Sequence, residues 1–196
     1  VSGIDKRIHS LKIQKRSEGE FGKTTVHQFV LSGSGRLAEE PAVRTRHIEF
    51  IGNSLTCGYG TDGKHRDEPF LVETENCNLT FASMVARYYD ADYTLIAHSG
   101  RGAARNYGDS VRVSKVTMKD RMLNTFDEDL THKWNFKEYR PDLVVINLGS
   151  NDFSTEPHPY KSEFTKAYKQ ILAQLREHYG DIPILCIYPV AMQAPV

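Results

Sequence analysis

The spacing of apolar residues changes near residue 46 and divides the chain into two parts. Before this point, apolar and polar residues tend to alternate in segments 9–16 and 25–31, with glycines between and after these segments. Such alternation is typical of half-buried strands, so we expect antiparallel strands there. Because a pair of strands is only marginally stable alone, they must pack on further structure, and we expect the chain before Val1 to supply it.

From residue 46 onward the apolar residues form continuous runs separated by helical stretches. Continuous runs are typical of parallel strands that are covered on both faces, so the pattern favours an α/β fold with a mainly parallel sheet. The predicted strands are Ile48–Ile51, Thr94–Ala97, Leu143–Leu148 and Ile184–Tyr188.

Helical spacing appears between these runs. Apolar residues recur at helical intervals from residue 164 to 179, Ser162 is a natural N-cap, and Gly180 stands where a helix would end. A second helix is predicted over 78–89. The polar stretch 111–139 predicts a long excursion with a short helix around Met118 to Phe126, and such excursions often carry substrate contacts.

Composition limits the partners and the size of the fold. With 196 residues, 39% of them hydrophobic, the chain can fill one core and part of another. Lys plus Arg equals Asp plus Glu at 25 each, so nothing electrostatic calls for nucleic acid or an anionic membrane. No window approaches the roughly 18 apolar residues of a membrane helix, and the N-terminus lacks an apolar signal core, so we expect a soluble chain.

The three cysteines have no metal-site spacing, which argues against zinc. Their odd number allows one disulfide or none, and the sequence leaves open whether Cys57 and Cys77 pair.

Polar segments follow three of the predicted strands: Gly52–Leu55, His98–Gly102 and Leu148–Phe153. Because parallel strands of an open α/β sheet place ligands at their carboxyl ends, we expect these segments to converge. A serine on a sharp strand-to-helix turn can attack a carbonyl and also offer its own N–H to the resulting oxyanion, which makes Ser54 the candidate nucleophile.

The ordered set Gly-Asn-Ser-Leu, Ser-Gly-Arg-Gly and Gly-Ser-Asn-Asp resembles the GDSL-like, or SGNH, hydrolase superfamily. Longer segments resemble carbohydrate esterase family 2, namely 50–60, 73–76, 98–108 and 146–154. The resemblance implies Ser54 as nucleophile, Gly100 as a backbone N–H donor to the oxyanion, and Asn151 as a side-chain amide donor.

The same resemblance implies a three-layer α/β/α hydrolase domain over 46–196, with residues 1–45 as the end of a preceding β-sandwich (jelly-roll) domain. It further implies a secreted serine esterase that removes O-acetyl groups from a polysaccharide such as xylan or glucomannan, with no metal or organic cofactor. Two alternatives stay open, a carbohydrate-binding protein on an incomplete esterase scaffold and a lipase-like acyl hydrolase.

Each of these residues also has a plainer interpretation. Ser54 can simply cap the following helix, Gly100 can be a turn glycine with Gly102 as the oxyanion donor, and Asn151 can form an Asx turn. Asp152 is expected to brace its own loop through backbone hydrogen bonds rather than to act as an acid.

Two features depart from the family pattern. Asn53 replaces the GDSL aspartate, and the expected C-terminal catalytic histidine is not found within residues 1–196. We expect that histidine beyond Val196, with His158 and His98 as internal alternatives. Without a base, residues 1–196 alone should be nearly inactive, since triad deletions cost up to ~10⁶ in turnover.

Overall fold

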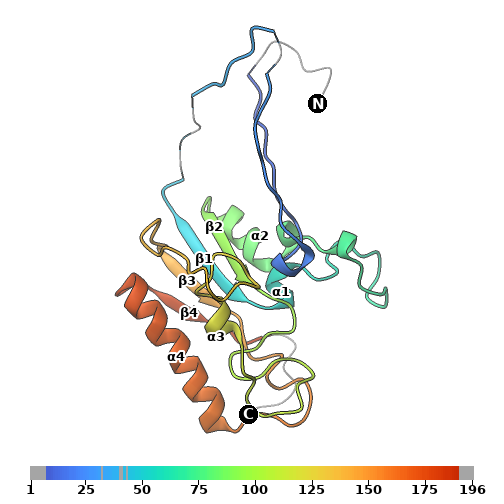
Figure 1. The fold of residues 1–196 in the computed structure, drawn as a ribbon, viewed down its shortest axis with the longest axis vertical. Coiled ribbons are helices and arrows are strands. Elements are labelled where there is room, and N and C mark those ends of the chain that lie inside the picture. The colour runs from blue at the N-terminus through green and yellow to red at the C-terminus, as the bar shows by residue number, and fades with distance from the viewer. Residues whose placement is uncertain (1–7, 32, 40–41, 43, 190–196) are drawn as a thin grey trace.

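The computed structural model describes residues 8–31, 33–39, 42 and 44–189. Among them, four parallel strands form one sheet in the order β2-β1-β3-β4 (Figure 1). The strands are β1 (His47–Gly52), β2 (Asp92–Ala97), β3 (Leu143–Ile146) and β4 (Ile184–Cys186). All four predicted strands are therefore confirmed, although β3 and β4 each end two residues earlier than predicted.

Helices cover both faces of this sheet, as Figure 1 shows. One face packs against α2 (Phe81–Tyr88), and the other packs against α3 (Met118–Arg121) and α4 (Lys161–Tyr179). Alternate residues of β3 enter the two cores: Val145 packs with α2, whereas Val144 and Ile146 pack with α3 and α4. This alternation follows because successive side chains of a strand point to opposite faces of the sheet. The predicted three-layer α/β/α fold is therefore confirmed.

The long helix α4 begins differently from the prediction. Tyr160 precedes its first residue, and the Tyr160 N–H donates to the side chain of Glu163 over 2.8 Å. Because this carboxylate satisfies the exposed N–H, no serine cap is needed, and the assignment of Ser162 as N-cap is wrong. The predicted end is confirmed, since Gly180 has φ +68° and its N–H donates to Arg176 O.

Short helical turns surround the other elements. Helix α1 (Ser54–Cys57) follows β1, and the 3-10 turns η2 (Val72–Thr74) and η3 (Cys77–Leu79) precede α2. The predicted helix over 78–89 is thus interrupted at Thr80, whose Oγ1 accepts the Ser83 N–H and starts α2. Helix α3 has four residues and is shorter than predicted.

The strands expected at 9–16 and 25–31 are not formed. The described residues there run as extended chain away from the sheet (Figure 1), with one 3-10 turn, η1 (Gly19–Phe21). Their apolar side chains are largely uncovered, for example Leu11 at 65% and Val30 at 82% exposure. Two extended segments with no covered apolar face gain little stability from pairing by backbone hydrogen bonds. The prediction of strands was therefore wrong, because it rested on alternation alone.

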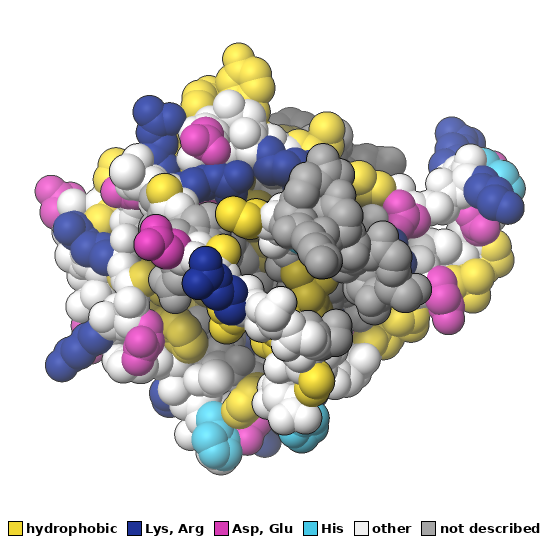
Figure 2. Space-filling view, turned by 90° about the horizontal axis from the view of Figure 1, so that it is seen from above, with side chains coloured by type: hydrophobic (Ala, Val, Ile, Leu, Met, Phe, Trp, Pro, Cys, Tyr) yellow, Lys and Arg dark blue, Asp and Glu magenta, His cyan; other side chains and the backbone are white. Residues whose placement is uncertain are grey.

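Among the described residues on the face drawn in Figure 2, acidic and basic side chains are interspersed, and neither sign forms a continuous patch. Within the described residues, no helix combines the length and apolarity needed to cross a membrane. Cys57, Cys77 and Cys186 are all free thiols, so the open question of a Cys57–Cys77 disulfide is answered negatively.

Candidate active site

Ser54 lies at the junction of β1 and α1, half-buried at the edge where the strands end. The preceding Asn53 caps the helix: its Oδ1 accepts the Leu55 N–H over 3.2 Å, and its backbone oxygen accepts the Thr56 N–H over 2.8 Å. At Gly52 a Cβ would lie 2.0 Å from Thr56 Oγ1. Only glycine therefore permits this sharp turn.

The loop after β2 contains the two candidate glycines. Gly100 has φ +74°, its oxygen accepts the Tyr107 N–H over 2.8 Å, and a Cβ there would meet nothing nearer than 3.9 Å. Gly102 is different, because a Cβ would lie 2.0 Å from Arg105 O and its N–H donates to Asn106 Oδ1 over 3.4 Å. Gly102 is thus a packing glycine whose N–H already has a protein partner.

The loop after β3 carries Asn151 and Asp152, both buried. Asn151 Nδ2 donates to Arg101 O over 2.8 Å. The Asp152 carboxylate accepts the backbone N–H groups of Ala103, Ala104 and Arg105 at 3.0, 2.7 and 2.9 Å. Burial raises the pKa of Asp152, while these hydrogen bonds oppose the rise. Asp152 is therefore a brace, as expected, but mainly of the loop after β2 rather than of its own loop.

Two side-chain hydrogen bonds bring the three strand-end loops together. Asn53 Nδ2 donates to Ser150 Oγ over 2.8 Å and ties the first loop to the third. The bond from Asn151 to Arg101 ties the third loop to the second. The predicted convergence of these loops at the carboxyl edge of the sheet is confirmed.

The two internal histidines already have partners. His98 is buried, with Nδ1 2.5 Å from Asp127 Oδ2 and Nε2 3.1 Å from Glu20 Oε2. Burial alone would raise the pKa of Asp127, but the hydrogen bond and charge of His98 hold it below its ordinary value. With both ring nitrogens facing carboxylates, His98 is poorly suited to accept a proton from a serine.

His158 lies in the loop before α4. Its Nδ1 is 3.4 Å from Glu156 Oε1, and its ring meets that of Phe153 edge to face with centroids 5.9 Å apart. These contacts are local to its own loop.

A buried acidic cluster behind α1 was missed by the sequence analysis. Glu18, Cys57 and Glu75 place possible ligand atoms within 4.8 Å of one another, beside a cavity of about 270 Å³. The only sequence feature that pointed to this cluster was segment 73–76, which resembles a segment of family 2 carbohydrate esterases. Glu18 gave no signal, because it lies beside Gly19 in the turn predicted between the strands 9–16 and 25–31. A second such group, Glu20, His98 and Glu128, is the ion-pair cluster around His98.

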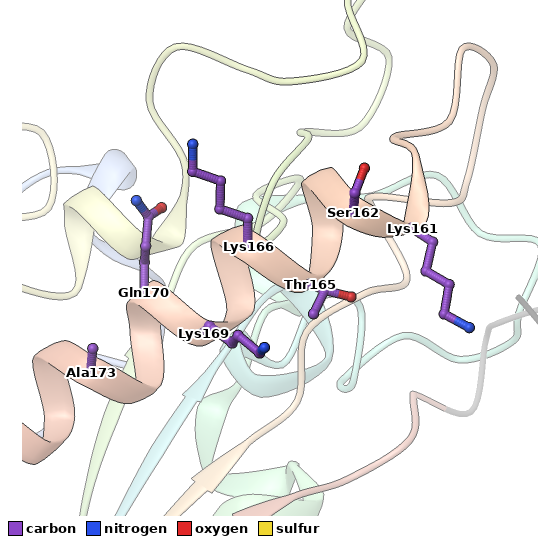
Figure 3. A pocket seen from close by; sticks show the side chains of 7 residues that line it. All are labelled: Lys161, Ser162, Thr165, Lys166, Lys169, Gln170 and Ala173. Atoms are coloured by element: carbon purple, nitrogen blue, oxygen red, sulfur yellow. The ribbon is translucent and has the colours of Figure 1, made fainter.

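A larger hollow than the one beside Glu18, about 760 Å³, lies elsewhere. Figure 3 shows that its seven lining residues, from Lys161 to Ala173, all come from α4. A hollow lined by one helix surface carries no convergent chemistry, so we do not assign the site to it.

Residues 50–196 match the model of the GDSL-like Lipase/Acylhydrolase family, and the chain belongs to this family. It is 38% identical over 186 residues to the cellulase/esterase CelE of Acetivibrio thermocellus, which covers 95% of this chain and 22% of that protein. It is 36% identical over 150 residues to an acetylxylan esterase / glucomannan deacetylase of Cellvibrio japonicus, covering 75% of this chain and 40% of that protein.

Among solved structures, the fold is similar to a family two carbohydrate esterase from Clostridium thermocellum in complex with cellohexaose. The TM-score is 0.73 at 38% identity, covering 80% of this chain and 46% of that chain. Family 2 carbohydrate esterases are thus its structural neighbours, as the resemblance implied. The chain spans less than half the length of these relatives.

Proposed function

We propose that residues 46–196 are the hydrolase part of a serine esterase that removes O-acetyl groups from a polysaccharide such as xylan or glucomannan. The observation that carries the proposal is the meeting of three strand-end loops, which puts the turn of Ser54 and the amide of Asn151 at one edge. The names of the relatives support acetylated xylan and glucomannan as substrates.

In the proposed mechanism, Ser54 Oγ attacks the acetyl carbonyl carbon while a general base takes the serine proton. The carbon–oxygen bond to the sugar then breaks, and the sugar hydroxyl leaves with that proton. Water next hydrolyses the acetyl-serine to acetate and restores Ser54.

The developing oxyanion accepts hydrogen bonds from the N–H groups of Ser54 and Gly100 and from the Asn151 amide. Asn151 Nδ2 carries two hydrogens: the bond to Arg101 O uses one and fixes the amide, and the other can be donated to the oxyanion. Asp152 holds the backbone that follows Gly100.

The serine proton needs an acceptor. His98 is held between Asp127 and Glu20, and His158 is paired with Glu156, so we assign this role to neither. The family likeness assigns it to a histidine after the fourth strand, and the experiments below therefore use the full-length protein. The mechanism needs no metal or organic cofactor.

We also propose that residues 1–45 belong to a β-sandwich domain. The exposed apolar side chains of Leu11, Ile13, Val26 and Phe29 support this, since a neighbouring sheet would cover them. Secretion is proposed because acetylated polymers are too large to be imported.

Acetate release from acetylated xylan and glucomannan by the full-length protein tests the function, with p-nitrophenyl acetate and a long-chain ester as further substrates. We expect hydrolysis of the acetyl substrates, and a loss of several orders of magnitude in Ser54→Ala. Ser162→Ala, on the exposed side of α4, is the matched control. Sugar binding without acetate release would favour the carbohydrate-binding alternative. A preference for the long-chain ester would favour the lipase-like alternative.

A further inference from the structure

Glu18 and Glu75 lie side by side in the interior, at 7% and 0% exposure. The Glu18 N–H donates to Glu75 Oε2 over 3.0 Å. The other carboxyl oxygen of each, Oε1, is buried and has no hydrogen-bond partner in the described structure. One oxygen of each carboxyl group lies within 4.8 Å of one of the other. Ionising both therefore carries an electrostatic cost, which a shared proton or a cation would remove.

The Glu18 carboxyl group contacts two parts of the candidate site, the loop that contains Gly100 and helix α1. Its Oε2 accepts the backbone N–H of Ser99 over 2.6 Å, one residue before Gly100. The same oxygen accepts the thiol of Cys57 over 3.5 Å, and Cys57 is the last residue of α1, the helix that starts with Ser54. One carboxylate oxygen thus joins the nucleophile helix to the Gly100 loop.

The pair is fixed from both sides. The residue after Glu75, Asn76, donates its N–H to Gly58 O over 3.0 Å at the end of α1. On the other side, Arg16 O accepts the Cys77 N–H over 3.1 Å. A shift of either carboxyl group would therefore be transmitted to α1.

We propose that Glu18 and Glu75 share one proton, and that this singly charged pair positions α1 and the Gly100 loop for the proposed ester hydrolysis, on which this inference rests. Glu75 carries this proton, close to the Glu18 carboxyl group. The negative charge stays on Glu18, whose Oε2 receives the Ser99 N–H and the Cys57 thiol. Both are positioning residues, since neither touches substrate.

Electrostatics favours a proton over a thiolate-bound cation. Burial, and then the negative charge of Glu18, raise the pKa of Glu75 to about 7. Burial also raises the pKa of the Cys57 and Cys77 thiols, which therefore stay uncharged. Lys15, whose charge acts to lower the pKa of Glu75, directs its Nζ to the backbone oxygens of Ser17 and Glu18. Above about pH 7 the pair should gain a second charge and its two carboxylates should repel each other.

The test uses the full-length protein and two replacements of the same residue. Glu75→Gln supplies an amide that donates to Glu18 at every pH, whereas Glu75→Ala supplies no donor. Glu49→Gln, which alters another buried carboxyl group with a raised pKa, is the matched control. The readouts are kcat and KM for p-nitrophenyl acetate between about pH 6 and about pH 9.

Above pH 7 we expect wild-type kcat to fall about threefold more than that of Glu75→Gln. Glu75→Ala should lower kcat about tenfold at every pH while KM changes less than about twofold, because the loops are displaced rather than the substrate contacts. Glu49→Gln should follow the wild-type pH profile. Identical pH profiles for wild type and Glu75→Gln, or full activity of Glu75→Ala, would overturn the proposal.

An infrared difference spectrum at about pH 6 provides a readout that needs no activity. We expect a protonated-carboxyl band in wild type that Glu75→Gln lacks. If that band is found and the wild type hydrolyses no ester, the proposed function fails and the shared proton stands. If the spectrum of wild type minus Glu75→Gln shows no such band, or if the wild type holds one divalent cation per chain that this variant loses, the shared proton is refuted.

Discussion

The side-chain amide of Asn53 donates a hydrogen bond to Ser150 Oγ over 2.8 Å, while its Oδ1 caps helix α1 at Leu55. One side chain therefore sets both the start of the helix that carries Ser54 and the junction of this helix with the loop of Asn151. The GDSL pattern has aspartate at this position. Because a serine hydroxyl both donates and accepts, Ser150 can pair with either residue.

Asn53→Ala should lower the free energy of unfolding by about 1–2 kcal/mol, because it removes the cap and the bond to Ser150. Asn53→Asp should lose less at neutral pH, since it keeps the cap and can accept the Ser150 hydroxyl. Urea unfolding measures both changes, with Asn135→Ala in the exposed excursion as a control. Equal losses in the two Asn53 variants would show that the amide hydrogen itself is required.

Asn151→Ala should reduce kcat about 10²- to 10³-fold in the full-length protein, since it removes one proposed oxyanion donor. Asn151→Asp should be impaired at least as much, because a carboxylate accepts but cannot donate. Steady-state kinetics with p-nitrophenyl acetate measure the effect, and thermal unfolding checks the fold. Normal deacetylation by either variant would exclude Asn151 from the oxyanion site.

The two glycines after β2 should respond differently to alanine. In Gly102→Ala the new Cβ would collide with Arg105 O and Asp152, so we expect a loss of about 1–3 kcal/mol or more. In Gly100→Ala the side chain meets open space, and the cost is the backbone strain at positive φ, about 1 kcal/mol. Chemical denaturation ranks the two variants, and the reverse order would contradict the packing described for this loop.

Glu49 should make stability depend on pH. It is buried on β1, and its Oε2 accepts the hydroxyls of Tyr139 and Tyr179 at 2.9 and 2.7 Å. Burial raises the pKa of Glu49 against these hydrogen bonds, so the folded protein holds this proton more tightly than the unfolded chain. The stability that this proton provides is fully present below about pH 4.5 and is lost as pH rises through the raised folded pKa.

Glu49→Gln should remove this component of the pH dependence. Urea unfolding at several pH values from about 4 to about 8 compares the slopes, and the exposed Glu138→Gln should keep the wild-type slope. A Glu49→Gln slope equal to that of the wild type would mean that Glu49 is already ionised in the folded protein.

The sheet and the strand-end loops could be predicted because buried parallel strands leave an unambiguous pattern. Runs such as Leu143–Ile146 are apolar on both faces, and the polar residues directly after them must lie at one edge. Strand lengths were less predictable, because Asn147 and Leu148 continue the buried stretch although the strand has already ended.

The residues that hold the loops of the candidate site in place could not be predicted, because their contacts join positions far apart in the sequence. Nothing local distinguishes Glu18, which meets Ser99 across 81 positions of sequence, from an exposed glutamate in a turn. The same holds for His98, whose partners Glu20 and Asp127 come from opposite directions along the chain. Alternation at 9–16 was a misleading signal, since local spacing predicts a strand without showing whether a partner covers it.

A fragment that begins at residue 46, where the spacing of apolar residues changes, would retain every strand and α-helix described here. It would nevertheless lose Glu18 and Glu20, so that the amide of Ser99 and Nε2 of His98 would be left to water, while His98 Nδ1 would keep Asp127. Chimeras that exchange this sheet and its loops between related proteins should therefore be joined upstream of Gln14, whose Nε2 lies 3.7 Å from Cys77 Sγ. The residues that hold the strand-end loops begin earlier in the chain than the sheet itself does.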